Sequence, residues 1–163
     1  MKYYTGVGAR DTPNNVLEMM YRIAIILHHQ GYILRSGGAK GADTAFENGA
    51  GGQKEIFYAR DATQEAMNIA ALYHPAWNKC SSFAKKLHGR NAFQVLGMSL
   101  GHPSEFILCW TPDGCVSHLD RNWGTGGTGT AISIAWANGI PVENLCRPDV
   151  YNKWSTWVNN YKP

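Results

Sequence analysis

Short apolar or β-branched runs alternate along this chain with segments of helical periodicity. Expected strands cover residues 3–7, 32–34, 54–58, 106–110 and 140–145, and expected helices cover 12–31, 44–48, 63–73, 81–100 and 130–137. When a helix follows each strand, it returns the chain to the same end of the sheet, and the strands pair in parallel. The sequence therefore predicts an α/β fold: a Rossmann-like, doubly wound, mainly parallel sheet with helices on both faces. Its ligand crevice should lie at the carboxyl ends of the strands.

The composition predicts one globular domain over residues 1–163, with a core at about 3–145. An aromatic tail at 150–163 should fold back on the surface as a short helix. The hydrophobic fraction of 44% and the charged fraction of 17% exclude a disordered chain. The apolar runs are far shorter than the roughly 20 residues of a membrane-spanning helix, and the first residues lack the apolar stretch of a signal peptide. We therefore expect a cytoplasmic protein without a membrane partner.

Glycine is the over-represented residue, with 18 copies against the roughly 11 that average usage would give. Half of them form three clusters, which are Gly6 and Gly8; Gly37, Gly38 and Gly41; and Gly124, Gly126, Gly127 and Gly129. Each cluster lies beside an expected strand or opens an expected helix. Free backbone N–H groups and the helix dipole favour an anion at such places. None of the clusters has the GxxxxGK[ST] spacing of a P-loop.

The segments 36–47 and 126–135, in this order, resemble the SMF/DprA-LOG superfamily of Rossmann-like proteins, and the similarity covers most of residues 3–145. This superfamily includes the lonely-guy phosphoribohydrolases and the DNA-processing protein A family. The chain is most similar to small stand-alone members that bacteriophages often carry. If it is phage-encoded, its compartment would be the host cytoplasm.

The lonely-guy enzymes cleave the N-glycosidic bond of nucleoside 5′-monophosphates with a PGGxGTxxE motif and an upstream arginine. The resemblance places Arg90 at the position of that arginine. The second motif departs from the pattern, because Thr125 replaces the proline and Ala131-Ile132-Ser133 follows the glycines without a carboxylate. Hydrolysis through an oxocarbenium-like state needs such a carboxylate. Glu47, Arg90 and Asp113 are the candidate catalytic residues for a chain that cleaves its ligand.

Ligand contacts are expected from the three glycine loops and from the Arg90 segment. The candidate binding residues are Gly6, Gly8, Arg10, Ser36, Gly37, Gly38, Lys40, Gly41, Asp43, Arg90, Asn91, Gly126, Gly127, Thr128, Gly129 and Thr130. Trp77 and Trp110 are candidates for stacking on a base. Arg10, Lys40 and Arg90 would hold phosphate.

Each candidate also has a purely structural interpretation. Glu47 fits a capping box with Thr44, and Asp43 fits a helix cap. The structural interpretation of Lys40 is a solvated surface lysine, that of Arg90 is a surface salt bridge, and that of Trp110 is packing in the core. A lone helical histidine such as His88 is more often structural than catalytic. The four cysteines contain no CxxC pair and no zinc-type spacing with histidine, so we expect reduced thiols, no metal and no cofactor.

Three functions remain open. The preferred one is a nucleotide-binding protein that holds a phosphorylated ribose nucleotide or a nucleotide-derived signal, which a phage could use to blunt host defence. The alternative is an N-glycoside hydrolase or transferase that acts on nucleoside 5′-monophosphates, and the third is a single-stranded DNA-binding recombination mediator. The net charge of +3 argues against nucleic acid as a partner. The resemblance implies a homodimer or a higher homo-oligomer.

Overall fold

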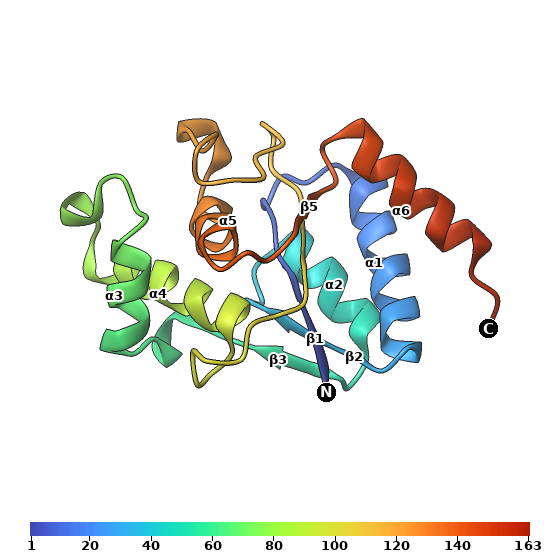
Figure 1. Cartoon of the computed structure of the whole chain (residues 1–163), viewed down its shortest axis with the longest axis horizontal. Helices are drawn as coiled ribbons and strands as arrows, with labels where there is room; N and C mark the ends of the chain where they lie inside the picture. The colour runs from blue at the N-terminus through green and yellow to red at the C-terminus, as the bar shows by residue number, and fades with distance from the viewer.

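A five-stranded parallel sheet forms the centre of the molecule, which a computed structural model describes from residue 1 to residue 163 (Figure 1). The strands are β1 (Lys2–Gly6), β2 (Tyr32–Ser36), β3 (Lys54–Ile56), β4 (Ile107–Cys109) and β5 (Val142–Asn144), in the spatial order β3-β2-β1-β4-β5. Every neighbouring pair is parallel. The predicted α/β, doubly wound fold is confirmed.

The α-helices cover both faces of the sheet (Figure 1). They are α1 (Asn14–His29), α2 (Ala42–Ala50), α3 (Gln64–Ala71), α4 (Ser82–Leu96), α5 (Thr128–Ala137) and α6 (Pro148–Asn160). One buried cluster joins α1, α2 and α6 to the sheet, and a second joins α3, α4 and α5 to the other face. Strand β4 is buried on both faces, which explains why its sequence is apolar throughout. Leu108 belongs to the first cluster, whereas Ile107 and Cys109 belong to the second.

Several helix boundaries differ from the expected ones, and the local hydrogen bonds explain why. Thr12, the first residue of the expected helix, lies outside α1: its hydroxyl donates to the carbonyl of Ala9 at 2.6 Å, and Pro13 occupies the N-cap. Helix α2 begins at Ala42, two residues before Thr44, so the expected capping box is absent. Glu47 instead pairs with Lys54 at 3.1 Å. Helix α4 ends at Leu96, since Gly97 follows with a φ of 79°.

The aromatic tail forms α6, which lies beside α1 at the surface (Figure 1). Pro148 occupies the first turn of α6, where its missing N–H has no cost. Trp154 and Trp157 pack against the cluster formed by α1 and α2. None of the six helices combines the length and the apolar character needed to cross a membrane.

Two 3₁₀ turns are also important for the site. They are η2 (Trp77–Lys79), between α3 and α4, and η3 (Trp123–Thr125), before α5. The strand order places β1 and β4 side by side at the centre, with the following helices on opposite faces of the sheet. The loops that leave these two strands therefore diverge, and ligands bind to open α/β sheets where such loops diverge.

Candidate functional site

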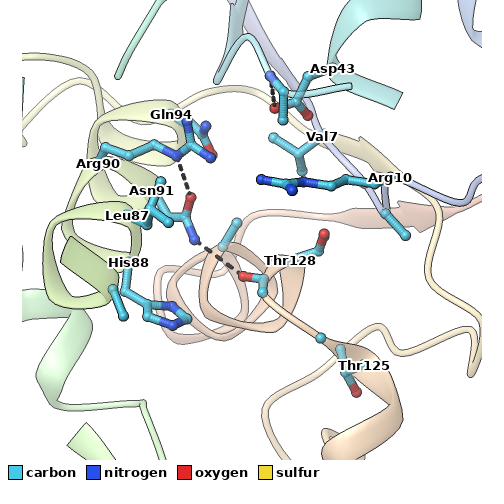
Figure 2. A pocket seen from close by; sticks show the side chains of 17 residues that line it. Val7, Arg10, Asp43, Leu87, His88, Arg90, Asn91, Gln94, Thr125 and Thr128 are labelled. Carbon is cyan, nitrogen blue, oxygen red and sulfur yellow. Dashed lines mark hydrogen bonds between the residues drawn. The ribbon is translucent and has the colours of Figure 1, made fainter. Parts of the chain in front are cut away.

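A cavity of about 330 Å³ opens at the carboxyl ends of the central strands (Figure 2). The loops after β1 and β2, one face of α4 and the start of α5 surround it. Its lining residues are Val7, Gly8, Ala9, Arg10, Ala39, Asp43, Ala84, Leu87, His88, Arg90, Asn91, Gln94, Thr125, Gly126, Gly127, Thr128 and Ala131. We call this cavity the crevice. Its position is the one that the sheet topology predicts for a ligand site.

Arg10 supplies an uncommitted positive charge to the crevice. It follows β1, and its side chain extends across the opening toward α4 and α5 (Figure 2). The guanidinium forms no salt bridge within the protein. The loop that carries it needs glycine, because a Cβ at Gly8 would lie 2.7 Å from the Cβ of Ala42. A guanidinium held at the mouth of a cavity can bind phosphate with two parallel hydrogen bonds.

The opposite wall is the start of α5. Gly126 has a φ of 73°, and a Cβ at Gly126 or Gly127 would meet no atom within 4 Å. The backbone therefore faces open space here, and a ligand can approach the main chain closely. The first N–H groups of a helix have no intrahelical partner and carry partial positive charge. Arg10 and this helix start together make the crevice suited to an anion.

Arg90 is held in the wall of the crevice rather than free within it. Its Nη1 donates to the carbonyls of Gly37 at 2.7 Å and Phe57 at 3.1 Å, and its Nε donates to Asn91 Oδ1 at 3.1 Å. Burial lowers the pKa of Arg90, Asp43 acts in the opposite direction, and Arg10 lowers the pKa further. Asn91 in turn donates to the carbonyl of Gly127 at 3.2 Å. Arg90 and Asn91 thus fix α4 against the loops that follow β2 and precede α5.

Asp43 is the carboxylate of the crevice. Its Oδ2 accepts a hydrogen bond from the N–H of Ala39 at 3.2 Å, and only 4% of the residue is exposed. Burial raises the pKa of Asp43 to about 6, although Arg90 and nearby backbone N–H groups oppose the shift. Asp43 lies in the first turn of α2, after the N-cap Gly41, so it orders the glycine loop from inside the helix.

His88 lies on α4 at the side of the crevice near α5 (Figure 2). Its Nδ1 is 2.9 Å from Thr130 Oγ1, and Arg121 donates to the same oxygen at 3.1 Å. Burial lowers the pKa of His88 to about 4, and the charges of His74, Arg121 and Arg90 add to the effect. The imidazole is therefore neutral near pH 7.

Eight of the predicted binding residues line the crevice: Gly8, Arg10, Asp43, Arg90, Asn91, Gly126, Gly127 and Thr128. The others lie outside it. Ser36 donates to the carbonyl of Gly6 at 2.6 Å and is buried. A Cβ at Gly6 would meet Phe46 at 2.6 Å, and one at Gly38 would meet Tyr58 at 2.9 Å. These residues shape the strand ends that carry the crevice.

Among the remaining candidates, a Cβ at Gly37 would meet the side chains of Arg90 and Gln94, and a Cβ at Gly41 would meet the backbone of Arg10. Gly129 and Thr130 are buried in the first turn of α5. Lys40 lines a separate surface hollow against α1, together with Leu17 and Glu18.

Two of the three candidate catalytic residues, Glu47 and Asp113, do not line the crevice. Glu47 is paired with Lys54 on the outer side of α2. Asp113 accepts hydrogen bonds from Thr111 at 2.7 Å, from Thr125 and from the N–H of Cys115. Burial raises the pKa of Asp113, but the hydrogen bonds from Thr125 and Thr111 outweigh it and lower the pKa overall. The carboxylate of Asp113 thus holds the loop before α5.

The two candidate stacking residues also lie outside the crevice. Trp110 packs against the core cluster on the α1 face. Trp77 belongs to η2, with its ring centroid 6.1 Å from that of His74 and 5.7 Å from Lys85 Nζ. Neither residue lines the crevice.

Sequence reasoning did not assign Ala84, Leu87 and Gln94 to the site, although all three line it. Ala84, Leu87, His88 and Asn91 have the spacing i, i+3, i+4 and i+7, which places them on one face of α4. This spacing is visible in the sequence. The face mixes apolar and polar residues, however, so the sequence does not distinguish it from a helix face that packs in the core.

Comparison with known proteins gives one informative similarity. No protein-family model and no curated protein matches the chain in sequence. A solved structure of DNA processing protein A from Helicobacter pylori superimposes with a TM-score of 0.56 at 12% identity, over 99% of this chain and 82% of that one. The chain therefore has a fold like that of DNA processing protein A.

The same comparison corrects one expectation. We expected nucleic acid to be an unlikely partner because the net charge is modest. The Helicobacter pylori structure is described for its mode of binding single-stranded DNA. Because a chain of this fold binds single-stranded DNA, the fold points toward nucleic acid, and the expectation was wrong.

Proposed function

We propose that the crevice binds single-stranded DNA through the phosphate and deoxyribose of one nucleotide. The observation that carries the proposal is the unpaired guanidinium of Arg10, which faces the start of α5 across the cavity (Figure 2). Both groups favour an anion, and the open backbone at Gly126 and Gly127 leaves room for it. A phosphate between them would complete their hydrogen bonds.

The choice of single-stranded DNA depends on two further points. The protein of similar fold is described as binding it. The side chain of Arg10 is also exposed, so a nucleic acid strand can reach it from solvent at the mouth of the crevice. Single-stranded nucleic acid suits such a site, because its backbone can bend into a local pocket that a duplex cannot enter.

A free nucleotide is the second candidate, and the size of the cavity favours it. About 330 Å³ lies within the range of small-molecule sites, and one mononucleotide is compatible with this space. The lining groups would be the same for both ligands. Competition between a mononucleotide and an oligonucleotide therefore separates the two candidates.

Cleavage of the ligand receives less support from the site. Asp43 is the crevice carboxylate, and it is buried, accepts a backbone N–H and has a raised pKa of about 6. Glu47 and Asp113 are engaged elsewhere. A glycosidase needs a carboxylate that can approach the sugar or an attacking water. We therefore favour binding over hydrolysis.

Substitution of Arg10 by alanine tests the proposal. Fluorescence anisotropy with a labelled oligothymidylate should show binding by the unaltered chain and a loss of about 10- to 100-fold in affinity for Arg10→Ala, since a hydrogen-bonded charge contributes about 1.5 to 3 kcal/mol. Arg22→Ala is the matched control. Arg22 is exposed on α1, where it contacts Asn159 at 3.5 Å, and it does not line the crevice.

Equal losses in Arg10→Ala and Arg22→Ala would show only a general charge effect and would contradict a site at the crevice. If a mononucleotide at near-stoichiometric concentration displaces the oligonucleotide, the ligand of the crevice is a free nucleotide and not single-stranded DNA. Absence of binding to either probe would exclude both candidates.

A further inference from the structure

A second cavity of about 620 Å³ adjoins the crevice, and His88, Gly126 and Gly127 line both. His74, Tyr73 and Arg121 also contribute to the second cavity. Beside it, the side chains of His74, Cys80 and His88 converge, with one potential ligand atom from each within 4.8 Å of the others. All three residues are half-buried. Neither the binding nor the cleavage hypothesis uses this cluster.

The cluster depends on how the chain connects α3 to α4. His74 follows the end of α3, Cys80 follows the 3₁₀ turn η2, and His88 lies near the middle of α4. Five residues separate His74 from Cys80 and seven separate Cys80 from His88, a spacing that matches no common zinc motif. The fold brings the three together because the connection turns back over the start of α4.

The geometry fits a tetrahedral metal site. Cys80 Sγ lies 3.7 Å from His74 Nε2 and 3.9 Å from His74 Nδ1. A tetrahedral zinc ion with ordinary Zn–S and Zn–N bonds separates its sulfur and nitrogen ligands by about 3.5 Å. The His74 and His88 rings are 4.4 Å apart between centroids, with an interplanar angle of 67°. Few local shifts are therefore needed to place all three ligand atoms around one ion.

Each of the two histidines also has a polar contact outside the cluster. His88 Nδ1 faces Thr130 Oγ1 at 2.9 Å, which leaves Nε2 of His88 available to a metal. His74 Nδ1 accepts the N–H of Ala76 at 3.0 Å. A neutral imidazole that accepts a hydrogen bond at Nδ1 carries its proton on Nε2, so metal binding by either nitrogen of His74 breaks the bond from Ala76. Ala76 is only two residues away in an irregular turn, so only this turn has to adjust.

The donor set selects the kind of ion. One thiol and two imidazoles suit a soft or borderline cation, and no carboxylate takes part, which disfavours Mg²⁺ and Ca²⁺. Arg121 lies nearby and donates to Thr130 and to the carbonyl of Tyr73 at 3.0 Å, so its positive charge opposes a cation. The thiolate that Cys80 forms on binding, with release of its proton to solvent, offsets that charge.

We propose that His74, Cys80 and His88 bind one Zn²⁺ ion as three protein ligands, with the fourth position open to the second cavity. Three protein ligands and an open position are typical of zinc sites that also hold water or an exogenous ligand. Because His88 lines the crevice as well, an anionic ligand that extends from the crevice into the second cavity would reach the open position. The zinc proposal does not depend on which ligand the crevice binds.

Cobalt substitution tests the site on the full, reduced and chelator-treated chain. Co²⁺ should bind with a stoichiometry of one and give the near-ultraviolet charge-transfer absorption of a thiolate ligand, which Zn²⁺ then abolishes. Cys80→Ser should lose this absorption, whereas Cys146→Ser should keep it. Cys146 is a matched control, because it is also a half-buried free cysteine and lies outside the cluster.

A second measurement guards against misfolded variants. At a Zn²⁺ concentration about 100-fold above Kd, the melting temperature of the unaltered chain should rise by about 5 to 10 °C. Cys80→Ser and His74→Gln should melt like the unaltered chain without metal and should lose the rise. An unchanged rise in both variants, or the absence of a charge-transfer band in the unaltered chain, would overturn the proposal.

Discussion

Asp43 is a buried, ionisable residue that lines the crevice. It is 4% exposed, and it orders the loop after β2 through the N–H of Ala39. Its pKa is raised from 3.8 to about 6, principally by burial. The folded state therefore binds a proton more tightly at this carboxyl than the unfolded state does. Stability due to Asp43 is fully present below about pH 4 and is lost as the pH rises through about 6.

Asp43→Asn should make this dependence visible, because an amide does not titrate. The free energy of unfolding of the unaltered chain, relative to Asp43→Asn, should fall by about 2.5 kcal/mol between pH 4 and pH 7.5. Urea denaturation at several pH values measures the difference, and titration of other groups cancels between the two proteins. A difference that stays constant with pH would contradict the raised pKa of Asp43.

At the scale of elements, α2 carries the crevice loop and depends on close packing against α1. Gly49 allows the approach, because a Cβ there would lie 2.5 Å from the carbonyl oxygen of Tyr21 and 2.7 Å from the Cβ of Ala24. Helix propensity alone favours alanine over glycine by about 1 kcal/mol. The backbone contact with α1 must outweigh that preference, since the carbonyl cannot move aside as a flexible side chain can.

Gly49→Ala should therefore destabilise the protein by about 2 kcal/mol, although alanine is the better helix former. Gly52→Ala is the control, because a Cβ at Gly52 would meet no atom within 4 Å. The control should change the free energy of unfolding by less than about 0.5 kcal/mol. Chemical denaturation of the three proteins distinguishes the cases, and a stabilised Gly49→Ala would show that α1 and α2 move apart easily.

Helix α4 links the two candidate sites. One of its faces lines the crevice with Leu87, His88 and Asn91, and His88 also belongs to the proposed zinc cluster. Periodicity predicted the helix, but not which face would meet the crevice. The sequence separates His88 from Thr130 by 42 residues. Only the packing of α4 on α5 brings them into contact, so local patterns could not identify this part of the site.

For the whole molecule, the low charge limits how DNA can be bound. The chain carries a net charge of +3, and Arg10 is an unpaired cation in the crevice. Affinity should therefore depend on few phosphate contacts. Each neutralised phosphate of a single strand contributes a slope of about −0.7 to a plot of log affinity against log salt concentration.

We expect a total slope of about −1 to −2, and Arg10→Ala should reduce its magnitude by about 0.7. Anisotropy titrations at several concentrations of sodium chloride measure both slopes. A much steeper slope, unchanged in Arg10→Ala, would place the DNA on a broad basic surface instead of the crevice.

The sequence by itself determined the class of fold. Alternating strand and helix periodicities favour parallel pairing, and the short apolar run of β4, stopped by Thr111-Pro112-Asp113-Gly114, predicts a strand buried on both faces. The glycine loops also located the carboxyl edge of the sheet, since glycine permits backbone geometries and close approaches that other residues exclude. Arg10, Asp43 and the Gly126–Thr128 turn line the crevice, and all were candidates from their glycine loops.

Tertiary structure decided which charged groups are free to act. Lys40, Glu47 and Asp113 carry the right chemistry in the right segments, yet each faces another partner or surface. Tertiary structure also brings His74, Cys80 and His88 together, although their spacing in the sequence matches no common metal motif. The physical reason is the same in both cases. Backbone conformation follows from local sequence, whereas the direction and neighbours of a side chain depend on packing between elements that are distant along the chain.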